Sequence, residues 1–203
     1  LEEVIITADE GIEKLNVRKP QMGVVALKAE TIELAPAVLG EVDLIKTIQL
    51  LPGVSNNGEG SAGFNVRGGA VDQNLVLLDE AIIYNTSHFF GLFSVFNNDA
   101  IKNVKLYKGD IPARFGGRTS SVLDVRQKEG NNKDLELNGG IGLISSRLAV
   151  ESPMFNKKGS FLLAGRTTYA QLFSGLLDDL GNSNISFYDL NLKTNYEINE
   201  NNK

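Results

Sequence analysis

The chain has 203 residues, of which 42% are hydrophobic and 22% charged, a balance that is typical of a folded protein and excludes a disordered polar tail. Its formal net charge is −5 and its basic residues are scattered, which argues against nucleic-acid binding. It has no cysteine and a single histidine, so disulfides, thiolate metal sites and multi-histidine metal sites are excluded. We therefore expect no metal and no cofactor. The 21 glycines indicate a β-rich fold with many tight turns.

The two ends of the chain suggest a piece of a longer protein. Leu1-Glu2-Glu3 lacks the basic and apolar regions of a signal peptide, and the chain stops at residues 201–203 directly after a strand-like run. No stretch approaches the ~20 consecutive apolar residues that a membrane-spanning helix needs. We expect an excised or processed fragment.

Residues 34–127 have the pattern of a compact domain that mixes helix and strand. Four apolar residues fall at helical spacing, Leu44, Ile45, Ile48 and Leu51. Pro52-Gly53 follows them, so we expect a short amphipathic helix that ends there and a polar glycine-rich loop at residues 55–63. Strands are expected at residues 22–29, 64–67, 74–79, 81–84, 101–109 and 120–126. These elements show no regular strand–helix–strand alternation, so the predicted fold class is α+β.

Residues 133–203 have the pattern of long amphipathic strands. Apolar and polar residues alternate strictly along residues 188–198, with a tyrosine toward each end of the apolar face. A soluble sheet would show the same alternation, but a length of about ten residues and aromatic margins favour a transmembrane β-barrel strand. Weaker copies at 134–152 and 159–173, with a polar turn at 152–159, predict two or three barrel strands in all. Residues 172–177 are interpreted as a short helical loop.

Barrel strands outside a closed barrel pose a physical problem. Their edges are unpaired, and one face is exposed and apolar. We therefore expect residues 133–203 either to pair with another copy of the chain or to fold back over the compact domain.

The sequence contains no catalytic constellation, and we predict that the protein is not an enzyme. A phosphate-binding loop, a nucleophile elbow and a His-Glu-x-x-His motif are all missing. His88 lies between a loop and aromatic residues, which indicates a packing or loop-anchoring role. Asp178-Asp179 indicates a solvated loop, because adjacent side chains point apart. Arg67 and Arg118 lie beside glycine pairs, where a guanidinium can pair with a carboxylate; a solvated surface arginine is the alternative.

Several long stretches, in this order, carry a resemblance to a known family. They read LGEVDLIKTIQLLPGV (39–54), FNVRGGAVDQNLVLLDEAIIYNTSHFFGLFSVFN (64–97) and AIKNVKLYKGDIPARFGGRTSSVLDVRQKEG (100–130). Residues 142–153, 160–169 and 187–196 continue the match. Together they resemble the plug domain and opening barrel strands of TonB-dependent outer-membrane receptors, and the Bacteroidetes type most of all.

The resemblance implies an active transporter in the outer membrane of a Gram-negative bacterium. Its plug would gate the barrel lumen, and the cargo would be a siderophore, a vitamin or an oligosaccharide. Residues 1–10 would be a TonB-box-like segment on the periplasmic side, 11–130 the plug, and 131–203 the first barrel strands. The implied partners are TonB, a small nutrient ligand, outer-membrane lipid and a surface lipoprotein. The alternative from the residues alone is a soluble periplasmic or cell-surface carbohydrate-binding module with a β-sheet tail.

The resemblance also implies three groups of functional residues. The TonB box would be Glu3, Val4, Ile5, Ile6, Thr7 and Ala8, an extended terminal segment able to add a strand to a partner sheet; a linker from a preceding domain is the alternative. The latch between plug and barrel would use Arg67, Lys108, Arg114 and Arg118, with acidic partners in strands beyond residue 203. Lys108 stands where the family motif commonly has arginine, and a lysine cannot fork two bonds to a carboxylate. The substrate-facing loops would present Asn57, Glu59, Tyr84, Asn85, His88 and Phe89.

Overall fold

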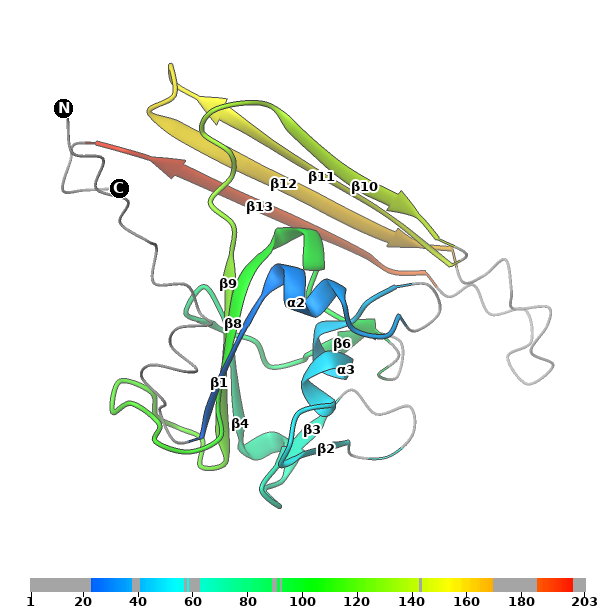
Figure 1. The fold of residues 1–203 in the computed structure, drawn as a ribbon, viewed down its shortest axis with the longest axis vertical. Helices are drawn as coiled ribbons and strands as arrows, with labels where there is room; N and C mark the ends of the chain where they lie inside the picture. Colours follow the sequence, from blue (N-terminus) through cyan, green and yellow to red (C-terminus); the bar gives the residue numbers. More distant parts are fainter. Residues whose placement is uncertain are drawn as a thin grey trace, which may run out of the picture.

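Two β-sheets packed against each other form the fold, with the second lying across the end of the first (Figure 1). The computed structural model describes residues 23–37, 41–56, 58, 63–88, 91, 93–142, 144–169 and 186–198. None of the helices in this described part of the chain is long and apolar enough to cross a membrane.

The first sheet has five strands and belongs to the compact domain. In spatial order they are β1 (Val24–Lys28), β8 (Ile101–Tyr107), β9 (Ser121–Gln127), β4 (Asn74–Leu78) and β5 (Ala81–Ile82). The pair β4–β9 is parallel and the other pairs are antiparallel. This mixed sheet confirms the predicted α+β class, and its strands lie where the sequence predicted them.

Short helices and two small hairpins complete the domain. Helix α3 (Leu44–Gln49) is the predicted amphipathic helix, and Asp43 caps it by accepting a bond from the Lys46 amide at 3.0 Å. Helix α2 (Ala29–Glu33) was not predicted, because its five residues bury a single side chain and carry no helical period. The hairpins pair β2 (Val54–Asn56) with β3 (Phe64–Val66), and β6 (Ser87–His88) with β7 (Phe93–Ser94). The 3₁₀ turns η1 (Val71–Gln73) and η3 (Asn98–Ala100) connect strands.

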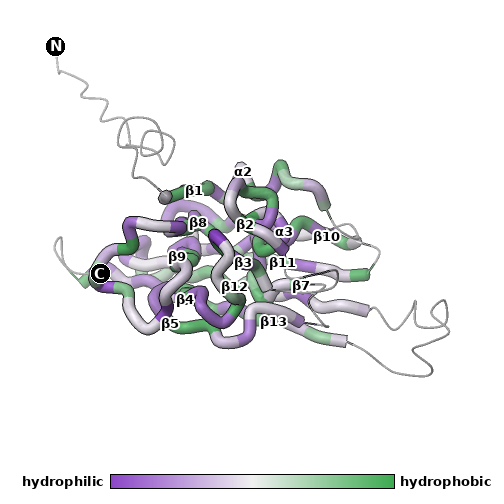
Figure 2. The backbone as a smooth tube through the Cα atoms, turned by 90° about the horizontal axis from the view of Figure 1, so that it is seen from below, coloured by the Kyte–Doolittle hydropathy of each residue, from purple (hydrophilic) through white to green (hydrophobic). Residues whose placement is uncertain are grey.

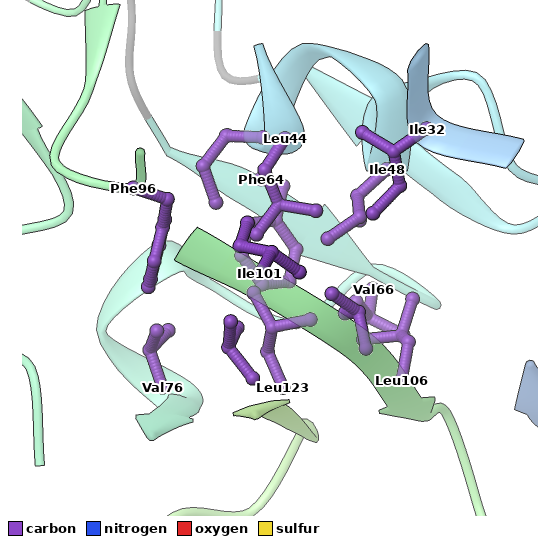
Figure 3. Close-up of a cluster of buried hydrophobic side chains, with 13 residues drawn as sticks. Ile32, Leu44, Ile48, Phe64, Val66, Val76, Phe96, Ile101, Leu106 and Leu123 are labelled. Atoms are coloured by element: carbon purple, nitrogen blue, oxygen red, sulfur yellow. The ribbon is translucent and has the colours of Figure 1, made fainter. Parts of the chain in front are cut away.

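The hydrophobic core lies between the helices and one face of the five-stranded sheet. Figure 3 shows side chains from α2, α3, β3, β8 and β9 pointing toward one another. Ile32, Leu44, Ile48 and Leu123 are all at most 1% exposed. Burial of apolar surface from these five separate elements therefore fixes the domain around this cluster.

The second sheet is an antiparallel meander of four strands. They are β10 (Glu136–Ile141), β11 (Ser145–Met154), β12 (Gly159–Thr168) and β13 (Tyr188–Tyr196). The prediction of a single strand over 134–152 was wrong: the chain reverses between Ile141 and Ser145, and the Gly142 amide donates to the Ser145 carbonyl at 2.8 Å. The predicted turn before β12 is confirmed, and the loop predicted at 172–177 lies outside the described residues.

Hydrophilic and hydrophobic residues both lie along the strands of this meander, which we call the strand sheet (Figure 2). Their side chains point to opposite faces, so the two faces differ in chemistry. Leu137, Val150, Leu163 and Leu192 lie opposite one another across its four strands and point away from the compact domain. On the same outward face Ile141 is 90% exposed. The inward face is largely polar. A barrel wall has this apolar-out, polar-in alternation.

The strand sheet folds back over the compact domain, the second of the two arrangements expected for it. Ala149, Leu162 and Ala164 on its inward face are buried against Ala100 of η3. Small side chains at three of these four positions let the two backbones approach closely.

The turn between β4 and β5 holds two non-glycine residues at positive φ. Asp79 has φ +46 and Glu80 has φ +73, the conformation of a two-residue hairpin turn that favours Asn-Gly. Glu80 bonds Arg126 at 3.1 Å. Burial alone would lower the pKa of Arg126, but its hydrogen bonds and attraction to Glu80 and Asp124 outweigh burial and raise that pKa.

Relieving this turn should stabilise the domain. Glu80→Gly and Glu80→Gln both remove the charge, but only glycine removes the left-handed strain, which costs about 1 kcal/mol. We expect the glycine variant to unfold at the higher denaturant concentration of the two. Equal midpoints in urea denaturation would show that the turn carries no such strain.

Candidate functional site

Arg166 of β12 is the centre of the contact between the strand sheet and the α+β domain. Its side chain is 2% exposed. Nη1 donates to Glu41 Oε1 at 2.6 Å, and Nη2 donates to the Ser94 carbonyl at 2.6 Å. Nε and Nη2 both donate to Asp189 Oδ2 of β13, at 3.0 and 2.5 Å. A buried guanidinium is stable only when paired this fully.

Asp189 extends this cluster to the hairpin β6–β7. Its Oδ1 lies 2.5 Å from His88 Nε2. The His88 ring stacks on the Phe187 ring, with centroids 4.4 Å apart. The Phe93 ring of β7 lies on the Phe187 ring too, with centroids 5.4 Å apart. Arg166 lies over Phe187 at 5.4 Å. His88 is therefore packed and anchored at the interface.

Glu41 and Asp43 connect the cluster to helix α3. Glu41 Oε2 accepts a hydrogen bond from the Ser145 hydroxyl of β11 at 2.7 Å. Asp43, which caps α3, also accepts the Ser94 amide at 2.6 Å. The Ser94 backbone therefore bonds two charged side chains: its amide donates to Asp43, and its carbonyl accepts from Arg166.

Further ion pairs join the two units along the rest of the interface. Arg147 pairs with Asp99. Lys193 donates to Asp79 at 2.9 Å, and Lys128 lies 3.4 Å from Glu151. These groups are more exposed than Arg166, so each pair contributes less to stability.

The four predicted latch residues have their contacts within the α+β domain. Arg67 has φ +50, and its guanidinium lies so close to Gly23 and Gly109 that a Cβ on Gly109 would be 2.8 Å from it. Lys108 Nζ donates to the Pro52 carbonyl at 2.7 Å. Arg114 lies over the Phe115 ring at 4.7 Å, and Arg118 lines a cleft. Their pairing with acids beyond residue 203 stays a prediction.

The cleft is where the two predicted substrate-facing loops meet. It has a volume of about 660 Å³, and Gly63 from the first loop and Tyr84 and Thr86 from the second line it with Arg118. Tyr84 is 83% exposed, and the Asn85 side chain accepts the Ser87 amide at 3.3 Å. Asn57, Glu59, Phe89 and the whole predicted TonB box, residues 3–8, lie outside the described residues.

The residues at the centre of the interface were not singled out from the sequence. The one available signal was strand alternation, which places Asp189 and Arg166 on the polar faces of their strands. Glu41 had no signal beyond its position before a predicted helix.

An α+β domain held by ion pairs against the polar face of an amphipathic meander defines a class: a domain that fits against a wall of strands. Residues 17–122, more than half of the chain, match the family described as TonB-dependent Receptor Plug Domain. The chain belongs to this family, and we call its α+β domain the plug. A search of curated proteins gave no match.

Solved structures of outer-membrane receptors share the fold. A mutant of the ferric enterobactin receptor PfeA from Pseudomonas aeruginosa, in complex with enterobactin, has a TM-score of 0.52 and 18% identity over 76% of this chain and 26% of its own. The siderophore receptor PirA from Acinetobacter baumannii has a TM-score of 0.53 and 21% identity, over 74% of this chain and 25% of its own. The outer-membrane transporter YddB from Escherichia coli has a TM-score of 0.54 and 14% identity, over 72% of this chain and 26% of its own. The chain thus spans about a quarter of their length.

Proposed function

We propose that this chain is the plug and the first wall strands of an outer-membrane, TonB-dependent active transporter. The observation that carries the proposal is the strand sheet: its outward face is apolar, and its inward face holds the plug through the buried ion pair of Arg166 and Glu41. A barrel strand in a membrane needs an apolar face toward lipid and a polar face toward the lumen. A soluble carbohydrate-binding module has no use for the outward rows of exposed leucine.

The lengths of the connections between the strands support one orientation of the wall. Outer-membrane barrels have short periplasmic turns and longer extracellular loops. The turn at 155–158 is short and the connection at 169–187 is long, which supports a periplasmic position for the former and an outside position for the latter. The Arg166 cluster lies at the β12–β13 end that we place outside. Residues 1–10 would be the periplasmic TonB-binding segment, 11–130 the plug and 131–203 wall.

The cargo we propose is a scarce nutrient in the class of siderophores, vitamins and oligosaccharides. One of the structures that share the fold is named a siderophore receptor and another a ferric enterobactin receptor, which supports the first of these classes. The cleft beside Tyr84 and Arg118, where the two loops meet, is the proposed approach of the ligand to the plug. Transport requires no covalent chemistry of the plug. The Bacteroidetes type and a surface lipoprotein partner are proposed from sequence resemblance alone; the neighbours named above come from Pseudomonas, Acinetobacter and Escherichia.

The TonB-binding role of residues 3–8 can be tested in cells that make the full-length receptor. Deleting residues 1–8 should abolish uptake and leave surface binding intact, measured with labelled ferric siderophore, cobalamin and oligosaccharide. Ile5→Pro should do the same, because proline cannot donate to an added strand. Ile5→Val, which keeps β-branching and the amide, is the matched control and should transport normally. Undiminished uptake in the deletion and the proline variant would refute the role.

A further inference from the structure

The hairpin β6–β7 is too small to hold its own position. It has two ladder pairs, Ser87 with Ser94 and His88 with Phe93, and one further bond from the Val95 amide to the Thr86 carbonyl at 3.0 Å. Isolated two-stranded hairpins are marginal even when longer. Phe93 and Ser94 are nevertheless 3% and 2% exposed. Contacts from outside the hairpin must therefore fix it.

The strand sheet supplies contacts to both strands of the hairpin. Arg166 donates to the Ser94 carbonyl on β7 at 2.6 Å. Asp189 meets His88 on β6 at 2.5 Å, and Phe187 packs against His88 and Phe93. Arg166 also donates two hydrogen bonds to Asp189, through Nε and Nη2. One guanidinium therefore contacts β7 directly and holds the carboxylate that contacts β6. A lysine, with one nitrogen, cannot make these contacts together.

We propose that Arg166 is the positioning residue by which the strand sheet sets the hairpin β6–β7, and with it loop residues 84–88, on the ligand-facing side of the plug. The inference rests on the proposed function, because that assignment makes the strand sheet a wall and this loop ligand-facing. It goes further than that function because it names the contact that fixes residues 84–88: the strand sheet holds them through buried Arg166. Asp43 fixes the Ser94 amide from the plug side.

Amide hydrogen exchange of the full-length receptor tests this without a ligand. In Arg166→Met the amides of Ser94 and Val95 should exchange roughly ten- to hundredfold faster, the factor that a hydrogen bond to a charged group contributes. Arg166→Lys should give a smaller increase. Lys193→Met is the matched control: it breaks the pair with Asp79 and should leave Ser94 and Val95 unchanged while the Gln127 amide, which bonds Asp79 at 3.1 Å, exchanges faster.

Unchanged exchange at Ser94 and Val95 in Arg166→Met would overturn the proposal. An equal rise at the Gln127 amide would overturn it too, because that pattern means general loosening of the interface. Nutrient uptake is not a readout, so failure of the wild-type receptor to transport would count against the proposed function and leave this measurement valid.

Discussion

Replacing Glu41 with alanine should lower the free energy of unfolding of the 203-residue chain by about 3 kcal/mol, because breaking a buried ion pair leaves a charge uncompensated. The side chains of Glu41 and Arg166 are 9% and 2% exposed, so water cannot replace the lost carboxylate. Asp189 still pairs with Arg166, which keeps the loss at the lower end of the range for buried pairs. Urea denaturation in mild detergent measures the change.

Glu33→Ala is the control for this prediction. Glu33 is an exposed acid on the nearby helix α2, so the same change of charge should alter stability by no more than about 0.5 kcal/mol. If Glu41→Ala and Glu33→Ala lower the free energy of unfolding equally, the change of net charge explains the loss, and the ion pair of Glu41 with Arg166 does not.

Three ion pairs of the interface have the opposite polarity to the latch implied by the family resemblance. That latch joins plug arginines to barrel glutamates, whereas Arg166, Arg147 and Lys193 of the strand sheet here meet acids of the plug. The pair of Lys128 and Glu151 keeps the polarity of the latch. The two arrangements are compatible. A plug that presents acids to the first strands and arginines to later strands would fit in one rotational position, since any other would bring like charges together.

The elements that the sequence predicted are those whose local signals are complete. Helix α3 has a helical period, a capping aspartate and a Pro-Gly stop. The strands β4, β8 and β9 are apolar runs bounded by turns. Helix α2 has no such signal, because it buries a single residue. The break between β10 and β11 leaves only a change of phase, since the outward residues are odd-numbered in β10, such as Leu137, and even-numbered in β11, such as Val150.

The centre of the interface could not have been predicted in the same way. Arg166 and Glu41 are 125 residues apart, and their contact depends on the register of two strands and on the sheet folding back over the plug. Alternation indicates that Arg166 faces inward. It cannot indicate which of the many acidic residues of the plug lies opposite.

Replacing Leu192 with lysine should prevent most of the full-length receptor from assembling. Leu192 is 67% exposed and completes the apolar row with Leu163, so a charge there would enter the proposed lipid face at a cost of about 2–4 kcal/mol near the midplane. The readout is the fraction of receptor that migrates as a folded, heat-modifiable barrel after extraction from outer membranes. Asn195→Lys carries the same charge on the inward face of the same strand, 3.2 Å from Glu129, and should assemble normally. Equal assembly of the two variants would mean that the outward face does not meet lipid, and the soluble carbohydrate-binding module would become the better account of the chain.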